Sequence, residues 1–129
     1  MRQGLIVLTI LGLLAGCSTL QHATPPQPPK QNLFIVFFVP GTVRLAPDAQ
    51  QIVQRAAWMA LQGKVSKIEI AVPRDAPGGA RLIEGRITSI ENILSAAHVD
   101  QKLLASTDLS DVAVSLPGAA DRGEIRLLP

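Results

Sequence analysis

The hydrophobic positions of this chain follow two different periods, and their order predicts a domain built from both strands and helices. Residues 33–39, LFIVFFV, form a continuous apolar run, which is typical of a strand covered on both faces. Residues 66–72, SKIEIAV, and 124–128, EIRLL, alternate apolar and polar positions, as strands with one wetter face do. Residues 112–116, VAVSL, predict a further strand.

Two segments between these strands carry apolar residues at helical spacing. Pro47 and Asp48 open the first, because proline suits the first helical position and a carboxylate favours the positive end of the helix dipole. This helix is expected to run to about Gln62, before Gly63, with Trp58 as a packing residue at the margin of its buried face. The residues expected on that face are Ile52, Val53, Ala56, Ala57, Ala60 and Leu61, and the second helix, 81–97, carries Ile83, Ile87, Ile90 and Leu94.

The resulting order is β-α-β-α-β-β. A helix of crossover length between two strands places them parallel and puts successive helices on one face of the sheet. The turn "PGAADRG" is short, so the last two strands are expected to be antiparallel, and Leu103 and Leu104 are expected to pack under the sheet in the preceding connection. The sequence therefore predicts an α+β fold: a two-layer sandwich with a mixed four-stranded sheet and two helices on one face.

The first residues of the chain have the pattern of a lipoprotein export signal. Arg2 precedes the apolar run 5–14, which is shorter than the ~20 residues that a membrane-spanning helix needs. Leu14-Ala15-Gly16-Cys17 then matches a lipobox, in which the cysteine thiol takes the lipid. We therefore expect a signal peptide at residues 1–16, an acylated (palmitate-bearing) Cys17 with a Pro-rich tether at 17–32, and a folded domain at 33–129.

Composition narrows the classes of partner and compartment. Removing residues 1–16 takes away one of twelve basic residues and none of the ten acidic ones, so the remaining charge is close to zero. This balance argues against nucleic acid, whose phosphates require a clear basic excess. Cys17 is the single cysteine, so no internal disulfide is possible. Ser18 follows it in place of aspartate, which for a lipoprotein of a two-membrane bacterium favours the outer membrane, with the domain facing the periplasm.

One stretch places opposite charges around a Pro-Gly-Gly break. In "VPRDAPGGARLIEGRI", residues 72–87, Asp75 precedes the break and Arg86 follows it in the first turns of the second helix. A strand end and a helix start are rigid points, so both side chains can converge on one small ligand with two charges. Alternatively, the loop is a solvated connection in which Arg74 or Arg81 neutralises Asp75.

Several motifs in this order resemble the OmpA-like peptidoglycan-binding family. They are the helix start Leu45-Ala46-Pro47-Asp48-Ala49, Asp75 after a strand, Leu82 and Arg86 in the next helix, and the closing "DRGEIRLL". The resemblance spans about residues 34–128 and implies the fold predicted above. It also implies that Asp75 and Arg86 bind the diaminopimelate of a peptidoglycan stem peptide, the carboxylate pairing with its ammonium and the guanidinium with its carboxylate. The family's Thr, Ser and Ala neighbours are replaced by Arg74, Ile83 and Ile87, and its loop is longer.

Two functions follow from this resemblance. The first is a non-catalytic outer-membrane lipoprotein that binds peptidoglycan and anchors the membrane, or an envelope complex, to the cell wall. The second is a structural subunit of an envelope-spanning secretion or motility assembly, with a lapsed peptidoglycan site and envelope proteins as partners. An enzyme is not expected, because neither His22 nor His98 has a metal-spaced partner and Glu84 fits a surface charge beside Arg81. No metal and no cofactor are predicted.

Overall fold

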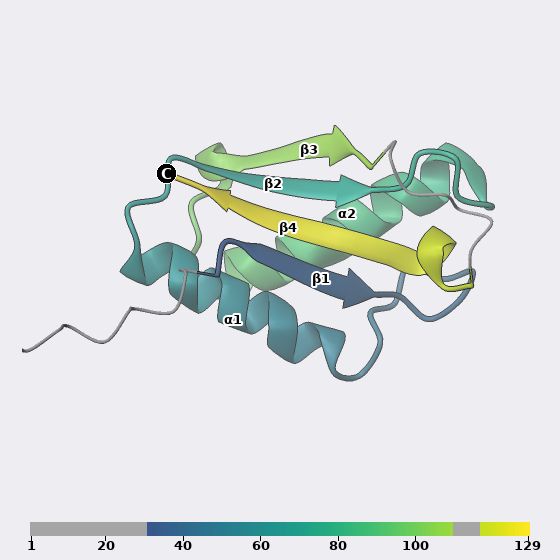
Figure 1. Ribbon diagram of the computed structural model, residues 1–129, viewed down its shortest axis with the longest axis horizontal. Coiled ribbons are helices and arrows are strands. Elements are labelled where there is room, and N and C mark those ends of the chain that lie inside the picture. The colour runs from purple at the N-terminus through teal and green to yellow at the C-terminus, as the bar shows by residue number, and fades with distance from the viewer. Residues whose placement is uncertain (1–30, 110–116) are drawn as a thin grey trace, which may run out of the picture.

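A computed structural model describes residues 31–109 and 117–129, which form one layer of strands and one layer of helices. The elements are β1 (Leu33–Phe37), α1 (Ala49–Gln62), β2 (Lys67–Val72), α2 (Gly79–Ala96), β3 (Leu104–Asp108) and β4 (Arg122–Leu128), with short 3-10 turns at Gln101–Leu103 and Ala119–Asp121. In Figure 1, α2 passes behind β2 and β4, and α1 lies alongside β1. Both helices contribute to one core with the strands.

The four strands make a mixed sheet in the order β1-β4-β2-β3. The last strand, β4, lies in the middle and runs antiparallel to both neighbours, so that Ile125 is opposite Phe34 of β1 and Ile70 of β2. β2 and β3 are parallel, with Ile68 opposite Leu104. Because β1 and β2 both oppose β4, they run in the same direction, as the helix between them predicts. The predicted α+β sandwich with a mixed four-stranded sheet is confirmed.

The third strand of the sheet lies earlier in the chain than predicted. The expected strand at 112–116 falls outside the described residues, whereas Leu104–Asp108, assigned to a connection, is β3. Its sequence, LASTD, is short and polar because an edge strand buries little, with Ser106 and Thr107 exposed. The last two strands of the structure run antiparallel, as expected, but they are not neighbours, since β1 and β2 lie on the two sides of β4. Leu103 and Leu104 do pack against the core, as expected.

The prediction that the first strand is covered on both faces is wrong. Phe34, Val36 and Phe38 are buried among the helices, but Leu33, Ile35 and Phe37 are 36%, 37% and 46% exposed. The helices cover only one face, so side chains that alternate along β1 point either into the core or into solvent. β2 alternates as predicted: Ile68, Ile70 and Val72 point into the core, and Lys67 is exposed.

Small residues let α1 lie close against the sheet. Ala49, Val53, Ala56, Ala57 and Ala60 are buried, and Ile52 and Met59 pack at the margin. Leu61, predicted on this face, is instead 53% exposed, and Trp58 is 62% exposed rather than packed at the margin. At 100° per residue, Trp58 points away from the alanine row, and Leu61 lies to one side of it.

In α2, Ile90 and Leu94 are fully buried and Ile83 and Ile87 partly so, which confirms the predicted face. The helix begins at Gly79, before the expected Arg81. Neither α-helix in the described ranges has the length and apolar character needed to cross a bilayer.

Candidate functional site

Asp75 lies on the loop between β2 and α2, with its side chain in solvent. The loop leaves the sheet through the buried Pro73 and turns at Gly78 and Gly79, whose φ angles of 117° and 74° favour glycine. In the described part of the chain, Asp75 takes part in no side-chain hydrogen bond and no ion pair.

Arg74, one of the two candidates to neutralise Asp75, turns to a different carboxylate. Its Nε lies 3.5 Å from Oδ2 of Asp108 at the end of β3, and its backbone N–H donates to Oδ1 of the same residue at 3.2 Å. These two contacts tie the loop to the parallel neighbour strand. Arg81, the other candidate, is exposed and forms no ion pair with any described residue.

Arg86 is the most deeply buried charged residue of the described chain, with 1% of its surface exposed. Its Nε donates to the carbonyl oxygen of Thr42 at 2.9 Å, Nη1 donates to that of Ala120 at 2.8 Å, and Nη2 donates to Oδ1 of Asp121 at 2.7 Å. The guanidinium carbon also lies 4.8 Å from the centre of the Phe38 ring. Arg86 thus joins α2 to the loop after β1 and to the turn before β4.

The counter-charge of Arg86 is Asp121, which the sequence analysis did not single out. Asp121 lies where the turn "PGAADRG" meets the closing segment "DRGEIRLL". These stretches were interpreted as a turn and a strand, and neither interpretation assigned a role to the Asp121 side chain. A buried guanidinium needs an anion and several acceptors, because desolvating a charge without them is very costly. The burial of Arg86, which the motif did not predict, therefore requires an acid from another segment, and Asp121 meets that need.

Two neighbours of Arg86 on α2 hold the same loop. Ser89 Oγ donates to the carbonyl oxygen of Val43 at 2.7 Å, and it also lies 2.9 Å from the carbonyl oxygen of Gly85. A Cβ atom placed on Gly85 would lie 2.6 Å from Cγ1 of Val43, so only glycine allows this approach. We call Gly85, Arg86 and Ser89 the loop clamp, because each contacts residues 42–43.

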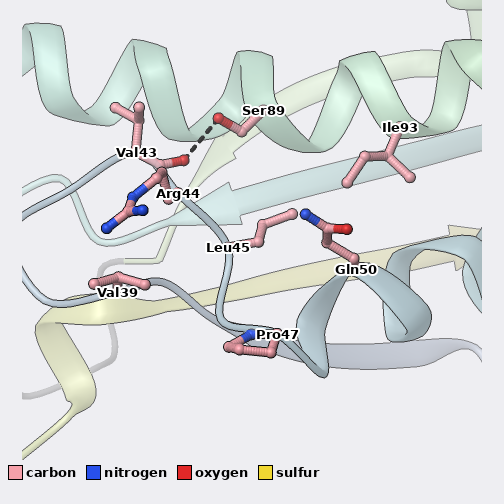
Figure 2. A pocket seen from close by; sticks show the side chains of 8 residues that line it. All are labelled: Val39, Val43, Arg44, Leu45, Pro47, Gln50, Ser89 and Ile93. Atoms are coloured by element: carbon pink, nitrogen blue, oxygen red, sulfur yellow. Dashed lines mark hydrogen bonds between the residues drawn. The ribbon is translucent and has the colours of Figure 1, made fainter.

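The clamped loop forms one wall of an open hollow of about 520 Å³ between the two helices. Figure 2 shows Arg44 and Gln50 on either side of Leu45, with the Ser89–Val43 hydrogen bond above them in the view. The remaining lining residues are Val39, Pro47 and Ile93. Arg44 and Gln50 point to different parts of the hollow, so they do not converge on one ligand atom.

The outer face of the sheet carries charged side chains that form ion pairs with one another. Glu124 is largely buried and pairs with Arg122 next to it, and its Oε2 lies 3.7 Å from Nη2 of Arg126. On β2, Lys67 Nζ lies 3.1 Å from Oε1 of Glu69. These pairs form a polar surface rather than a convergent catalytic arrangement.

The described residues contain no group of three or more His, Cys, Asp or Glu side chains that could hold a metal ion. His98 is exposed just after α2, and Glu84 is exposed on α2. Cys17 and His22 lie outside the described residues.

Comparison with known proteins identifies the fold. No family model and no curated protein matches this sequence. Among solved structures, the OmpA-like domain of FopA1 from Francisella tularensis superposes with a TM-score of 0.60 at 11% identity, covering 74% of this chain and 73% of that one. A putative MotB-like protein from Desulfovibrio vulgaris gives 0.57 at 19% identity, covering 74% and 72%. An outer membrane protein from Borrelia burgdorferi gives 0.54 at 20% identity, covering 75% and 87%.

These likenesses define the class of fold. The chain has an OmpA-like fold, as the resemblance of its motifs implies, and the identities of 11–20% extend to the fold alone.

Proposed function

We propose that this chain is a non-catalytic, lipid-anchored OmpA-like domain of the bacterial cell envelope. It acts as an interaction subunit of an envelope assembly, and its Asp75–Arg86 site no longer binds diaminopimelate. The burial of Arg86 is the observation that carries this proposal. A zwitterionic ligand requires both of its charges to be met, and here the positive half of the expected pair is committed to the protein itself.

The contacts of Arg86 leave little for a ligand. A guanidinium has five N–H donors, and each of its three nitrogens already donates to an acceptor of the chain. Asp121 occupies the position that a ligand carboxylate would take against Nη2, at 2.7 Å. A ligand would have to displace a charge-assisted hydrogen bond in a desolvated site, which opposes binding.

Peptidoglycan binding is the second candidate, and the state of Asp75 favours it. This carboxylate is exposed, and the described residues give it no basic partner. It is therefore free to pair with an ammonium group of a cell-wall peptide, with the guanidinium of Arg81 near it along the chain as a replacement for that of Arg86. In this second role the protein anchors its membrane to the cell wall.

A sacculus sedimentation assay distinguishes the two functions. The wild-type chain, Asp75→Ala and the matched control Glu84→Ala, which removes an equally exposed acid on α2, are mixed with purified peptidoglycan and centrifuged. The lapsed site predicts that all three proteins stay in the supernatant. Sedimentation of the wild type and Glu84→Ala, but not of Asp75→Ala, would overturn the first proposal and support the second. Sedimentation of all three proteins would also overturn the first proposal, and would indicate that another surface of the domain binds peptidoglycan.

The lipid anchor has its own test. One acyl chain gives only marginal membrane affinity, whereas several chains hold a protein at the bilayer. A clickable palmitate analogue should label the wild-type chain in cells and leave Cys17→Ala unlabelled. Equal labelling of both proteins would contradict the assignment of Cys17.

The non-catalytic assignment is checked with muropeptides. Incubation of the purified chain with defined muropeptides is expected to give no new product by mass spectrometry. A product that depends on protein concentration would contradict the proposal.

A further inference from the structure

The two most exposed large apolar side chains of the described residues lie together on α1. Trp58 is 62% exposed and Leu61 is 53% exposed. They are three positions apart, so they are neighbours on the side of the helix that faces away from the sheet, which we call the outer face of α1. The other exposed residues of this face are polar: Gln51, Gln54, Arg55 and Gln62.

The outer face of α1 lies at the end of the domain that the predicted tether enters. A hollow of about 600 Å³ beside the end of α1 is lined in part by Gln31, Met59, Gln62 and Lys64. Gln62 therefore belongs both to the outer face and to the hollow that holds the first described residue. Figure 1 shows this end of α1 on the same side of the molecule as the start of β1. A lipid on Cys17 is thus joined to the domain next to Trp58 and Leu61.

The charge around the outer face of α1 is basic. Residues 49–66 contain no acid, and their two basic residues, Arg55 and Lys64, are both exposed. Neither forms an ion pair with any described residue, including Pro129, which lines the same hollow. The tether at 17–32 contains no acid either. This side of the domain therefore attracts an anionic surface, and no acid of these segments repels one.

We propose that the outer face of α1 docks on the phospholipid surface that holds the lipid anchor, an inference that rests on the anchoring of Cys17 in the proposed function. Trp58 and Leu61 enter the interfacial region of the bilayer. Tryptophan is favoured there, because its ring is apolar while its indole N–H still reaches water or a headgroup. Arg55 and Lys64 contact lipid phosphates, since long basic side chains carry their charge to the headgroups over apolar stems.

The small size of the apolar patch favours a lipid surface over a protein partner. Two apolar side chains are far fewer than the roughly 20–30 residues that each side of a standard protein interface contributes. A bilayer needs less, because the tether makes the contact intramolecular and raises the effective concentration of the surface. Residues 18–30 span at most about 40 Å when extended, so the anchored domain stays within reach of the bilayer.

Docking on this face keeps the Asp75 loop away from the bilayer. α1 ends shortly before β2 begins, whereas Asp75 follows the other end of β2. Figure 1 accordingly shows the loop between β2 and α2 at the opposite side of the molecule from the end of α1. The docked domain would therefore present its exposed loop to other components of the envelope.

Trp58 reports on the docking directly, because it is the only tryptophan of a chain that has no tyrosine. The mature protein is purified from membranes and reconstituted in vesicles of phosphatidylethanolamine and phosphatidylglycerol, with plain or brominated acyl chains. Docking predicts several-fold weaker Trp58 emission in the brominated vesicles. The control combines Trp58→Phe with Ser106→Trp, which moves the indole to the exposed edge strand β3, and should emit equally in both. Equal emission of Trp58 in the two kinds of vesicle would overturn the proposal.

Charge variants test the phosphate contacts. Arg55→Gln and Lys64→Gln should each lower the ratio of docked to free domain about fivefold in these anionic vesicles. The ratio is obtained from the quenched and unquenched fluorescence lifetimes of Trp58, and circular dichroism verifies that each variant is folded. The matched control Arg81→Gln removes an exposed arginine of α2 that also forms no ion pair with a described residue, and should leave the ratio unchanged. Equal effects of all three substitutions would overturn the assignment of this face.

The lipid anchor and the docking can fail separately. Mass spectrometry of the purified protein detects acylation of Cys17, and a protein without acyl chains would contradict the proposed function. That protein is then coupled through the thiol of Cys17, its single cysteine, to a maleimide phospholipid, and the quenching is measured again. Quenching after coupling would support docking, whereas an anchored protein without quenching would overturn docking alone. Protection of Trp58 from an aqueous quencher only when envelope proteins are added would overturn the choice of a lipid surface.

Discussion

Arg86 and Asp75 were predicted from the same stretch of sequence, and the structure gives them opposite surroundings. Arg86 is almost completely enclosed, with three hydrogen bonds to two distant segments and a counter-charge in Asp121. Asp75 extends into solvent from a loop, with no ion pair to a described residue. Matching a motif residue by residue predicted which charges are present but not what each one faces.

The difference also separates a charge that holds the fold together from a charge that is exposed for recognition. A guanidinium with several acceptors in a desolvated site holds chain segments together, because removing it leaves acceptors without donors. A carboxylate on an exposed loop contributes little to folding and is free for recognition. If Arg86 is structural and Asp75 is not, substitutions around Arg86 should lower the stability of the fold. Substitutions at Asp75 should leave stability unchanged and affect ligand binding at most.

Arg86→Ala should have the largest effect. It leaves Asp121 and the carbonyl groups of Thr42 and Ala120 without their donor, and we expect a loss of about 3 kcal/mol in the free energy of unfolding. Urea denaturation measures this loss. Arg86→Lys should recover only part of it, because an ammonium cannot reproduce the planar arrangement of three donor nitrogens. A stability unchanged by Arg86→Ala would contradict a structural role.

Gly85→Ala should have the next largest effect, and combining it with Val43→Ala tests whether a steric clash is the cause. The added Cβ would lie 2.6 Å from Cγ1 of Val43, so the loop must shift at a cost of roughly 1–3 kcal/mol, against a gain in helix propensity of about 1 kcal/mol. We expect a net loss in the wild-type background and a net gain in the Val43→Ala background. Thermal denaturation of the four proteins in this cycle gives the coupling between the two positions. Equal effects in both backgrounds would rule out the steric explanation.

Ser89→Ala should cost about 1 kcal/mol, because it removes the hydrogen bond to the carbonyl oxygen of Val43. The neighbouring Thr88→Ala, at an exposed position, serves as the control and should leave stability nearly unchanged. Both are read by urea denaturation. An effect at Thr88 as large as that at Ser89 would mean that the helix, rather than the loop contact, was weakened.

Asp75→Ala should have the smallest effect, leaving the free energy of unfolding unchanged within about 0.5 kcal/mol. The expectation follows from its exposure and from the absence of a basic partner among residues 31–109 and 117–129. Asp121→Ala provides the contrast, since it removes the counter-charge of the buried Arg86 and should be clearly destabilising by the same urea assay. Similar losses for the two aspartates would end the distinction between the two regions.

Much of the fold could be predicted from the sequence, for reasons visible in particular elements. The helical period in α2 and the alternation in β2 identify their buried faces directly, because one face of each meets the core. β3 was missed because an edge strand of sequence LASTD buries too little to leave a pattern. The exposure of Leu33, Ile35 and Phe37 was missed because an apolar run cannot distinguish a strand covered on both faces from one whose outer side chains are apolar.

Of the candidate site, the sequence supplied Asp75 and Arg86 but not the residues that decide what they do. The partner of Arg86 is 35 positions away along the chain, and that of Arg74 is 34 positions away. Such pairings have no sequence period, since they depend on how the turn before β4 and the end of β3 are placed against α2 and β2.

The sequence by itself determined the kinds of element, their order and the buried faces of β2 and α2, because burial of apolar side chains imposes a local period on each element. Only the tertiary structure decided that β4 enters the middle of the sheet, that Arg86 is enclosed with Asp121, and that β1 keeps an open apolar edge. These outcomes depend on contacts between distant segments, whose energies are fixed by three-dimensional packing and desolvation rather than by neighbours along the chain.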